Sequence, residues 1–356
     1  MFHALGSLTF AGALSFLVLQ LWTRRRVKAS DALDLLPESQ DSRQSKDRWL
    51  SASDLFLRQK LIPFGSPAYE SFPDPPRLPP RRAFVPQENE DFVHRLWKVN
   101  TRPRVMSWIA PRAEHWMALD KFGRNVYLKL CPRYSEEWQI LEYLADSTPS
   151  RHPWNRTIPT MGFFRTRRSM VIVQACWGTG AFSPTWDSLR TRLFLARQLL
   201  QGLAYMHMMG VAHGDLHPEN IVCNHEDVRF SSRKSGTSFQ STFDFQLAFI
   251  DFENSVRVPA GHSQAITTVF GIPPEPFAAP EMIPADTVDL FAADVFSAGQ
   301  LLQFELNRNM ADSGHDPPTV PEYLALIAKM TARVAPQRPS ALDALGELEQ
   351  IICDHI

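Results

Sequence analysis

The sequence predicts an α+β fold in which a small β-rich half precedes a larger helical half. Between residues 105 and 173, short apolar runs of strand length alternate with turn residues. From Asp187 to Met208, apolar residues recur at helical spacing and give a long helix one apolar face. The length of 356 residues fits two domains or one large two-part domain.

The composition is that of a globular protein. Hydrophobic residues make up 44% and charged residues 21%, which excludes a wholly disordered chain, a collagen and a coiled-coil rod. The 37 Lys and Arg residues nearly balance the 38 Asp and Glu residues, so no basic excess indicates a nucleic-acid partner. The four cysteines form no C-x-x-C pair, and we expect buried, reduced thiols.

The N-terminal segment predicts a single transmembrane helix over residues 5–22. These 18 residues carry no charge, and as a helix they would span about 27 Å, close to a hydrocarbon core of roughly 30 Å. Arg24, Arg25, Arg26 and Lys28 follow at once, so the positive-inside rule predicts that the rest of the chain faces the cytosol. The alternatives are a signal peptide, disfavoured because a basic n-region and a good cleavage site are lacking, and a segment lying on a membrane surface. The sequence does not choose between membranes.

Residues 23–91 are predicted to be a linker, charged in its first part and proline-rich in its second. A short helix is expected near residues 51–60, with Ser51 or Ser53 as its cap. The prolines between residues 73 and 86 favour an extended polyproline conformation. Their P-x-x-P spacing suits an aromatic groove on a partner protein, and a plain spacer is the alternative.

The globular part begins near residue 92. Its expected elements, in chain order, are strands at 105–109, 116–119 and 126–130, a helix at 135–145, a strand at 170–173 and the helix at 187–208. Ser135 is the expected N-cap of the first helix, whose first turn is acidic.

Acidic and amide side chains gather just after the long helix. Asp215 and Asn220 lie five residues apart, ahead of a short apolar strand, and Asp251 ends a later strand. Two carboxylates and an amide at strand ends suit a general base and the ligands of a divalent cation. Mg²⁺ prefers oxygen ligands and binds through one or two carboxylates together with substrate phosphates.

This arrangement resembles the protein kinase family. HGDLHPEN at residues 213–220 is similar to the catalytic loop H-R-D-L-x-x-x-N, and Asp251 begins a counterpart of the D-F-G element. Five further elements stand in the order that the family has. Before the loop, Lys129 corresponds to the strand lysine and Glu137 to its helix partner. After it, Ala279-Pro280-Glu281 corresponds to A-P-E, residues 294–299 to the start of the large helix, and Arg338 to the late arginine that pairs with Glu281.

The resemblance implies a bilobal protein kinase-like domain over residues 92–352, with an N-lobe at about 92–175 and a C-lobe at about 176–352. Its implied activity is transfer of the γ-phosphoryl group of ATP, with Mg²⁺, to a Ser/Thr hydroxyl of a protein substrate. By the same resemblance, the roles would be these: Lys129 binds the ATP phosphates and pairs with Glu137, Asp215 accepts the proton of the attacking hydroxyl, and Asn220 and Asp251 bind Mg²⁺.

Departures from the pattern favour a catalytically weak or dead pseudokinase as an alternative. Segment 109–116, at the place of the glycine-rich loop, contains no glycine, so Arg112 or His115 is a candidate for binding phosphate there instead. Gly214 replaces the arginine of H-R-D, His217 replaces the lysine that follows, and Glu253 replaces the glycine of D-F-G. A small-molecule phosphotransferase is the second alternative, because the catalytic loop also resembles that of aminoglycoside- and choline-type kinases.

Two segments differ in length from the family pattern. Residues 224–246 insert a polar stretch between the two catalytic strands, which we expect to be a loop. The short distance from Gly299 to a helix starting near Pro321 predicts a shortened substrate-docking helix.

Overall fold

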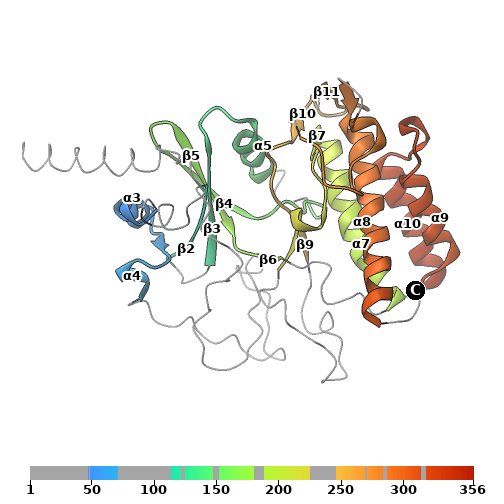
Figure 1. The fold of residues 1–356 in the computed structure, drawn as a ribbon, viewed down its shortest axis with the longest axis horizontal. Helices are drawn as coiled ribbons and strands as arrows, with labels where there is room; N and C mark the ends of the chain where they lie inside the picture. Colours follow the sequence, from blue (N-terminus) through green and yellow to red (C-terminus); the bar gives the residue numbers. More distant parts are fainter. Residues whose placement is uncertain are drawn as a thin grey trace, which may run out of the picture. The chain divides into compact units, whose positions relative to one another are not determined.

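The computed structural model describes residues 49–70, 114–121, 125–146, 152–179, 188–224, 246–268, 271–283, 287–313 and 318–356, together with Asp47. These residues form two compact units (Figure 1). The sheet unit contains the described residues of 49–76, 99–134 and 161–174, and the helical unit contains those of 135–160 and 175–356. An α+β composition is therefore confirmed.

The sheet unit is built on five strands. They are β1 (Ile62–Pro63), β2 (His115–Leu119), β3 (Asn125–Pro132), β4 (Thr160–Arg165) and β5 (Ser169–Ala175), in the order β1-β2-β3-β5-β4. β2 pairs antiparallel with both β1 and β3, and His115 lies opposite Lys129. β5 lies between two other strands and is buried along its whole length, which explains its continuous apolar run.

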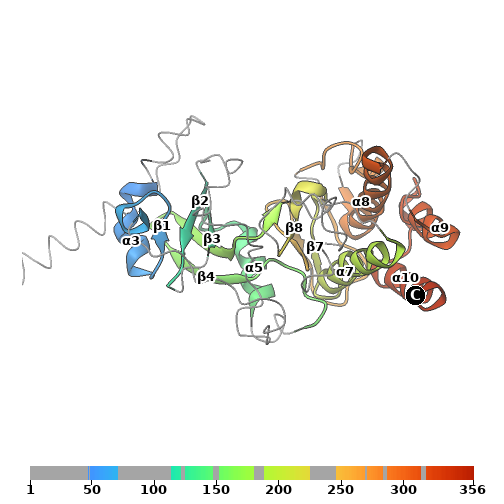
Figure 2. The same cartoon turned by 90° about the horizontal axis from the view of Figure 1, so that it is seen from below.

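Residues 49–70 belong to the sheet unit, so the prediction of a linker is wrong for this part of 23–91. β1 pairs with β2, and α3 (Ser53–Arg58) and α4 (Pro67–Glu70), both labelled in Figure 1, contact it. Figure 2 shows α3 beside β1. Trp49 stacks on Phe56 at 5.5 Å and on Trp116 at 6.3 Å between ring centroids. These aromatic contacts bury apolar surface, which outweighs the polar composition of the surrounding segment.

The capping prediction is wrong for α3, whereas for the helix at 136–145 the predicted N-cap position is confirmed. Ala52 is the N-cap residue of α3, and the hydroxyl of Ser53 donates to the Leu50 carbonyl instead of capping. Ser135 does occupy the N-cap position of α5 (Glu136–Ala145), but its side chain makes no capping hydrogen bond. The proline-rich residues 73–86, and with them the P-x-x-P motif, lie outside the described residues.

α5 and residues 152–160 group with the helical unit, whereas the sequence assigned them to the N-lobe at 92–175. Hydrogen bonds and one cation–ring contact connect these segments to the rest of the helical unit. Ile158 donates its N–H to the Phe249 carbonyl, and the Arg156 carbonyl accepts the N–H of Phe249. The Arg257 guanidinium lies 3.5 Å from the ring centroid of Tyr143 on α5.

Four helices make up most of the helical unit: α7 (Leu189–Met208), α8 (Leu290–Ser313), α9 (Pro321–Met330) and α10 (Ala341–His355). They lie side by side (Figures 1 and 2). α7 begins two residues later than predicted, because Ser188 caps it by accepting the Thr191 N–H at 3.1 Å. Arg192 on α7 and Glu305 on α8 form a fully buried ion pair at 2.8 Å that joins two of these helices.

Short strands position the loops of the helical unit. They are β6 (Gly178–Thr179), β7 (Val211–Ala212), β8 (Ile221–Cys223), β9 (Leu247–Phe249), β10 (Val256–Arg257), β11 (Ile266–Thr268) and β12 (Thr287–Asp289). The insert at 224–246 joins β8 to β9; Asn224 and Gln246 at its ends are hydrogen bonded to each other, and residues 225–245 lie outside the described residues.

Residues 5–22 also lie outside the described residues. In the part of the chain that the structure describes, no helix combines the length and the apolar character needed to cross a bilayer. All four cysteines are free thiols, as expected; three are buried, and Cys353 is exposed, contrary to the prediction.

Candidate active site

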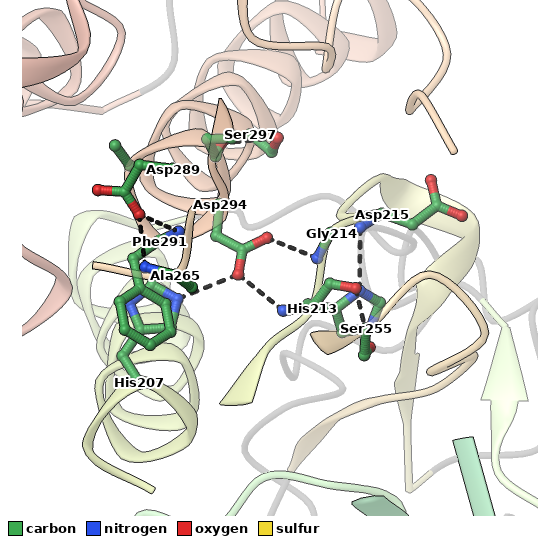
Figure 3. Close-up of polar contacts among 12 residues, drawn as sticks. His207, His213, Gly214, Asp215, Ser255, Ala265, Asp289, Phe291, Asp294 and Ser297 are labelled. Atoms are coloured by element: carbon green, nitrogen blue, oxygen red, sulfur yellow. Dashed lines mark hydrogen bonds and ion pairs between the residues drawn. The ribbon is translucent and has the colours of Figure 1, made fainter. Parts of the chain in front are cut away.

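A buried carboxylate on α8 holds the loop that follows β7. Asp294 is 1% exposed, and its two oxygens accept the backbone N–H groups of His213 at 2.8 Å and Gly214 at 2.9 Å (Figure 3). His207, on α7, lies with Nε2 3.0 Å from the same carboxylate. Hydrogen bonds to a charged acceptor are about twice as strong as neutral ones, so Asp294 fixes the backbone just ahead of Asp215.

His213 is a packing residue with defined hydrogen bonds. It is fully buried beside the ring of Phe252, 5.0 Å away between centroids. Nε2 lies 3.0 Å from the Ile250 carbonyl, which only accepts, so this nitrogen carries the proton and Nδ1 accepts the Asp215 N–H at 3.3 Å. Burial lowers the pKa of His213 below the usual 6.5, against the opposing effect of Asp294.

The Asp215 side chain projects from this fixed loop and is 18% exposed. Oδ2 accepts a hydrogen bond from Asn254 Nδ2 at 3.2 Å, and Oδ1 lies 3.8 Å from His217 Nε2. Asn220 donates from Nδ2 to the Asp215 backbone carbonyl at 2.8 Å. The structure therefore brings Asp215 and Asn220 together, as the sequence predicted.

Asp251 lies two residues after the end of β9 in a strained backbone conformation. Its φ is +64°, in the left-handed region that non-glycine residues rarely adopt. The Ile250 N–H donates to the Asn220 carbonyl at 3.1 Å, which connects this strand end to the loop at 213–220, and Phe252 is fully buried. Strain of this kind persists where the surroundings impose it, typically at functional sites.

The other predicted site residues are distributed over both units. Lys129 is on β3 of the sheet unit and is 6% exposed, and Glu137 is on α5 of the helical unit and is 4% exposed. Burial of a lysine or a glutamate is unusual unless the charge is compensated, which argues against plain surface roles. Arg112 lies outside the described residues.

The expected ion pair between Glu281 and Arg338 is present. Arg338 Nη1 and Nη2 bind the two oxygens of Glu281 at 2.6 and 2.7 Å. The same guanidinium donates to the Ala292 and Ala332 carbonyls and lies 4.9 Å from the ring centroid of Phe296. This bidentate pair anchors the A-P-E-like segment to α8 and the turn before α10.

Sequence reasoning missed the residues that position this loop. The functions of Asp294, His207, Ser255 and Asn254 were not predicted; Ser255 donates to the His213 carbonyl at 2.8 Å. One sequence signal could have identified Asp294: it is an acidic residue within the apolar start of a predicted helix. An acidic side chain is almost never fully buried unless it has hydrogen-bond or charge partners.

The residues present fit a Mg²⁺ ion bound together with substrate phosphates. Since Asn220 uses Nδ2 to hold the Asp215 carbonyl, its amide oxygen is the atom left to bind a cation. Among the described residues, no group of three or more His, Cys, Asp or Glu side chains is placed to hold a metal alone. Mg²⁺ needs only one or two carboxylates when phosphates supply further oxygens, and the donor types of Asn220 and Asp251 fit that requirement.

Comparison with known proteins agrees with this arrangement. The family model of the protein kinase domain matches residues 151–320. The dual specificity protein kinase lkh1 of Schizosaccharomyces pombe is 26% identical over 196 residues, which cover 51% of this chain and 27% of that protein. The myosin light chain kinase family member 4 of Mus musculus is 30% identical over 142 residues, 38% of this chain and 31% of that protein.

A third relative is the serine/threonine-protein kinase chk1 of Schizosaccharomyces pombe, 33% identical over 109 residues, 31% of this chain and 18% of that protein. The chain spans less than a third of the length of each of these relatives. The matched region contains the loop at 213–220, Asp251 and the A-P-E-like segment, whose geometry is described above. We conclude that this chain carries a protein kinase domain over residues 151–320.

Proposed function

We propose that this chain is a protein kinase that uses ATP and Mg²⁺ to phosphorylate Ser/Thr hydroxyls of proteins. One observation carries the proposal: Asp294 fixes the backbone ahead of Asp215, while Asn220 fixes the backbone carbonyl of Asp215 itself. A general base must be held within hydrogen-bond reach of the hydroxyl from which it takes a proton, and this loop supplies that rigidity.

The proposed chemistry assigns one task to each residue. Asp215 orients the acceptor hydroxyl and takes its proton, and Lys129 and Glu137 keep the roles that the resemblance implies for them in binding the ATP phosphates. Asn220 and Asp251 hold Mg²⁺, which neutralises charge on the phosphates when bound. Because phosphoryl transfer passes through a loose transition state, positioning and charge neutralisation supply most of the rate enhancement.

The test combines nucleotide binding with phosphate transfer, using the full chain in detergent. Mg²⁺-ATP is expected to raise the unfolding midpoint by mass action, and Lys129→Ala and Asp251→Asn to abolish the rise. Asp215→Asn is expected to keep the rise but to lose transfer to casein by at least about 100-fold. Asp354→Asn, the same change at an exposed residue of α10, is the matched control.

A pseudokinase is the second candidate, and His217 is the observation that favours it. Its Nε2 lies 3.8 Å from Asp215 Oδ1, beyond hydrogen-bond distance, at a position where the family pattern has a lysine. A lysine ammonium is charged at neutral pH, whereas an imidazole carries a positive charge only when it is protonated. A midpoint that does not move up to millimolar Mg²⁺-ATP would refute the kinase and favour the pseudokinase.

We also propose that residues 5–22 anchor the chain in a membrane with the kinase domain in the cytosol. The supporting observation is the uncharged 18-residue run followed by basic residues. The full chain is expected to remain in membranes after alkaline carbonate extraction, whereas a chain lacking residues 1–28 is released. Protease added to sealed vesicles should digest the kinase domain when the cytosolic face is outside.

A further inference from the structure

We propose that Asn254 is a positioning residue that orients the carboxylate of Asp215; this inference rests on the proposed kinase function. Asn254 comes directly after the D-F-G-like element at residues 251–253, and it belongs to none of the motifs that identify the family. Its side-chain Nδ2 lies 3.2 Å from Asp215 Oδ2. The contact joins the turn after β9 to the catalytic loop, 39 residues earlier in the chain.

The chemistry of the two groups determines the direction of this hydrogen bond. An ionised carboxylate only accepts, so the amide nitrogen must donate. His217 lies 3.8 Å from the other oxygen, too far to donate. Among the described residues, Asn254 is therefore the one side chain that donates to this carboxylate.

The two oxygens of Asp215 consequently differ. Oδ2 is occupied by Asn254, and Oδ1 has no donor within hydrogen-bond distance among the described residues. We infer that Oδ1 is the atom that accepts the substrate hydroxyl. Without Asn254 the carboxylate could rotate about its terminal bond, because that torsion has no sharp staggered preference.

Asn254 is itself held in place by close backbone packing. A Cβ on Gly214 would lie 2.5 Å from the Asn254 carbonyl oxygen, and a Cβ on Gly271 would lie 2.5 Å from atoms of its side-chain amide. The neighbouring Ser255 binds the His213 carbonyl at 2.8 Å and closes a turn with its N–H on the Phe252 carbonyl. Because residues 214 and 271 are glycines, the backbone at both positions can approach Asn254 closely. These two contacts restrict the movement of Asn254.

The test compares two substitutions that separate hydrogen-bond donation from packing. Asn254→Asp keeps the shape but replaces the donor by a second carboxylate about 3 Å from Asp215. Asn254→Ala removes the amide without adding charge. Asn307→Asp and Asn307→Ala make the same changes at an exposed residue of α8 and are the controls. The readouts are kcat and KM for ATP with casein as acceptor, Mg²⁺-ATP binding by thermal shift, and the unfolding midpoint.

If Asn254 positions the base, Asn254→Ala should lower kcat by about 10- to 100-fold, the range expected for losing one hydrogen bond to a charged group. Asn254→Asp should lower kcat further, and both should leave KM for ATP and nucleotide binding within about twofold of wild type. A purely packing role predicts the opposite order, with Asn254→Asp close to wild type.

Each other outcome identifies which proposal fails. If wild type transfers phosphate and either Asn254→Asp or Asn254→Ala keeps wild-type kcat, the positioning role is overturned while the kinase function stands. If Asn254→Ala increases kcat, Asn254 blocks the base instead of positioning it, and the inference is again wrong. If wild type neither binds Mg²⁺-ATP nor transfers phosphate, the proposed function fails and this inference fails with it.

Discussion

Removing the Asp294 carboxylate should loosen the catalytic loop and destabilise the chain. In Asp294→Ala the N–H groups of His213 and Gly214 lose the acceptor that they contact at 2.8 and 2.9 Å. Each buried donor left without a partner costs about 1–3 kcal/mol, so the two together cost about 2–6 kcal/mol. That is a large share of the roughly 5–15 kcal/mol by which a domain is stable.

Asp294→Asn should cost about half as much. The amide oxygen can still accept one N–H, while the amide NH₂ group faces the other donor. Urea unfolding gives the change in free energy, and hydrogen exchange of the peptide covering residues 211–216 gives the local effect. Exchange at His213 and Gly214 should accelerate about tenfold for each 1.4 kcal/mol of lost local stability.

Asp289 on β12 provides the matched control. Its carboxylate accepts the N–H groups of Ala265 at 2.9 Å and Phe291 at 3.1 Å, in the same region of the fold (Figure 3). Asp289→Ala should therefore accelerate exchange around residues 265 and 291 but not in the catalytic loop. If Asp294→Ala loses less than about 1 kcal/mol and leaves both loop amides protected as in wild type, the reasoning about buried acceptors is refuted.

Three further predictions concern the same unit. Arg338→Met should destabilise the chain by about 3–5 kcal/mol in urea unfolding, because it leaves the Glu281 carboxylate without its partner; a change below 1 kcal/mol would contradict this. Gly214→Ala should cost about 1–3 kcal/mol, since φ is +77° and the new Cβ would lie 2.5 Å from the Asn254 carbonyl; a neutral effect would mean that the loop shifts freely. Burial lowers the pKa of His213 below 6.5, so the unfolded state binds its proton first as the pH falls. His213 then stabilises the fold above pH 6.5, and stability declines as the pH falls below that value; the decline, followed by urea unfolding from pH 7.5 to 5, should be smaller in His213→Asn.

Local sequence patterns predicted the strands and helices in which buried apolar residues are continuous or recur at regular spacing. β2, β3 and β5 follow from short apolar runs, and α7 follows from helical spacing of its apolar residues. The motifs at 213–220, 251–253 and 279–281 identified the kinase domain because each is continuous in sequence and their order is informative. The pairing of Glu281 with Arg338 followed from the resemblance and is present at 2.6 Å.

Only the tertiary structure decided how the site is held. Asp294 meets His213 and Gly214 across about 80 residues, and Asn254 meets Asp215 across 39. The strand at Ile62–Pro63 joins the sheet by pairing with β2, more than 50 residues away in sequence. Such contacts leave no periodic pattern in the sequence. Each polar side chain is held by a single partner far away in the chain, and the short strand forms because it pairs with a sheet edge that is distant in sequence. The sequence therefore determines which residues are available for chemistry, while long-range hydrogen bonding determines which of them are held in position.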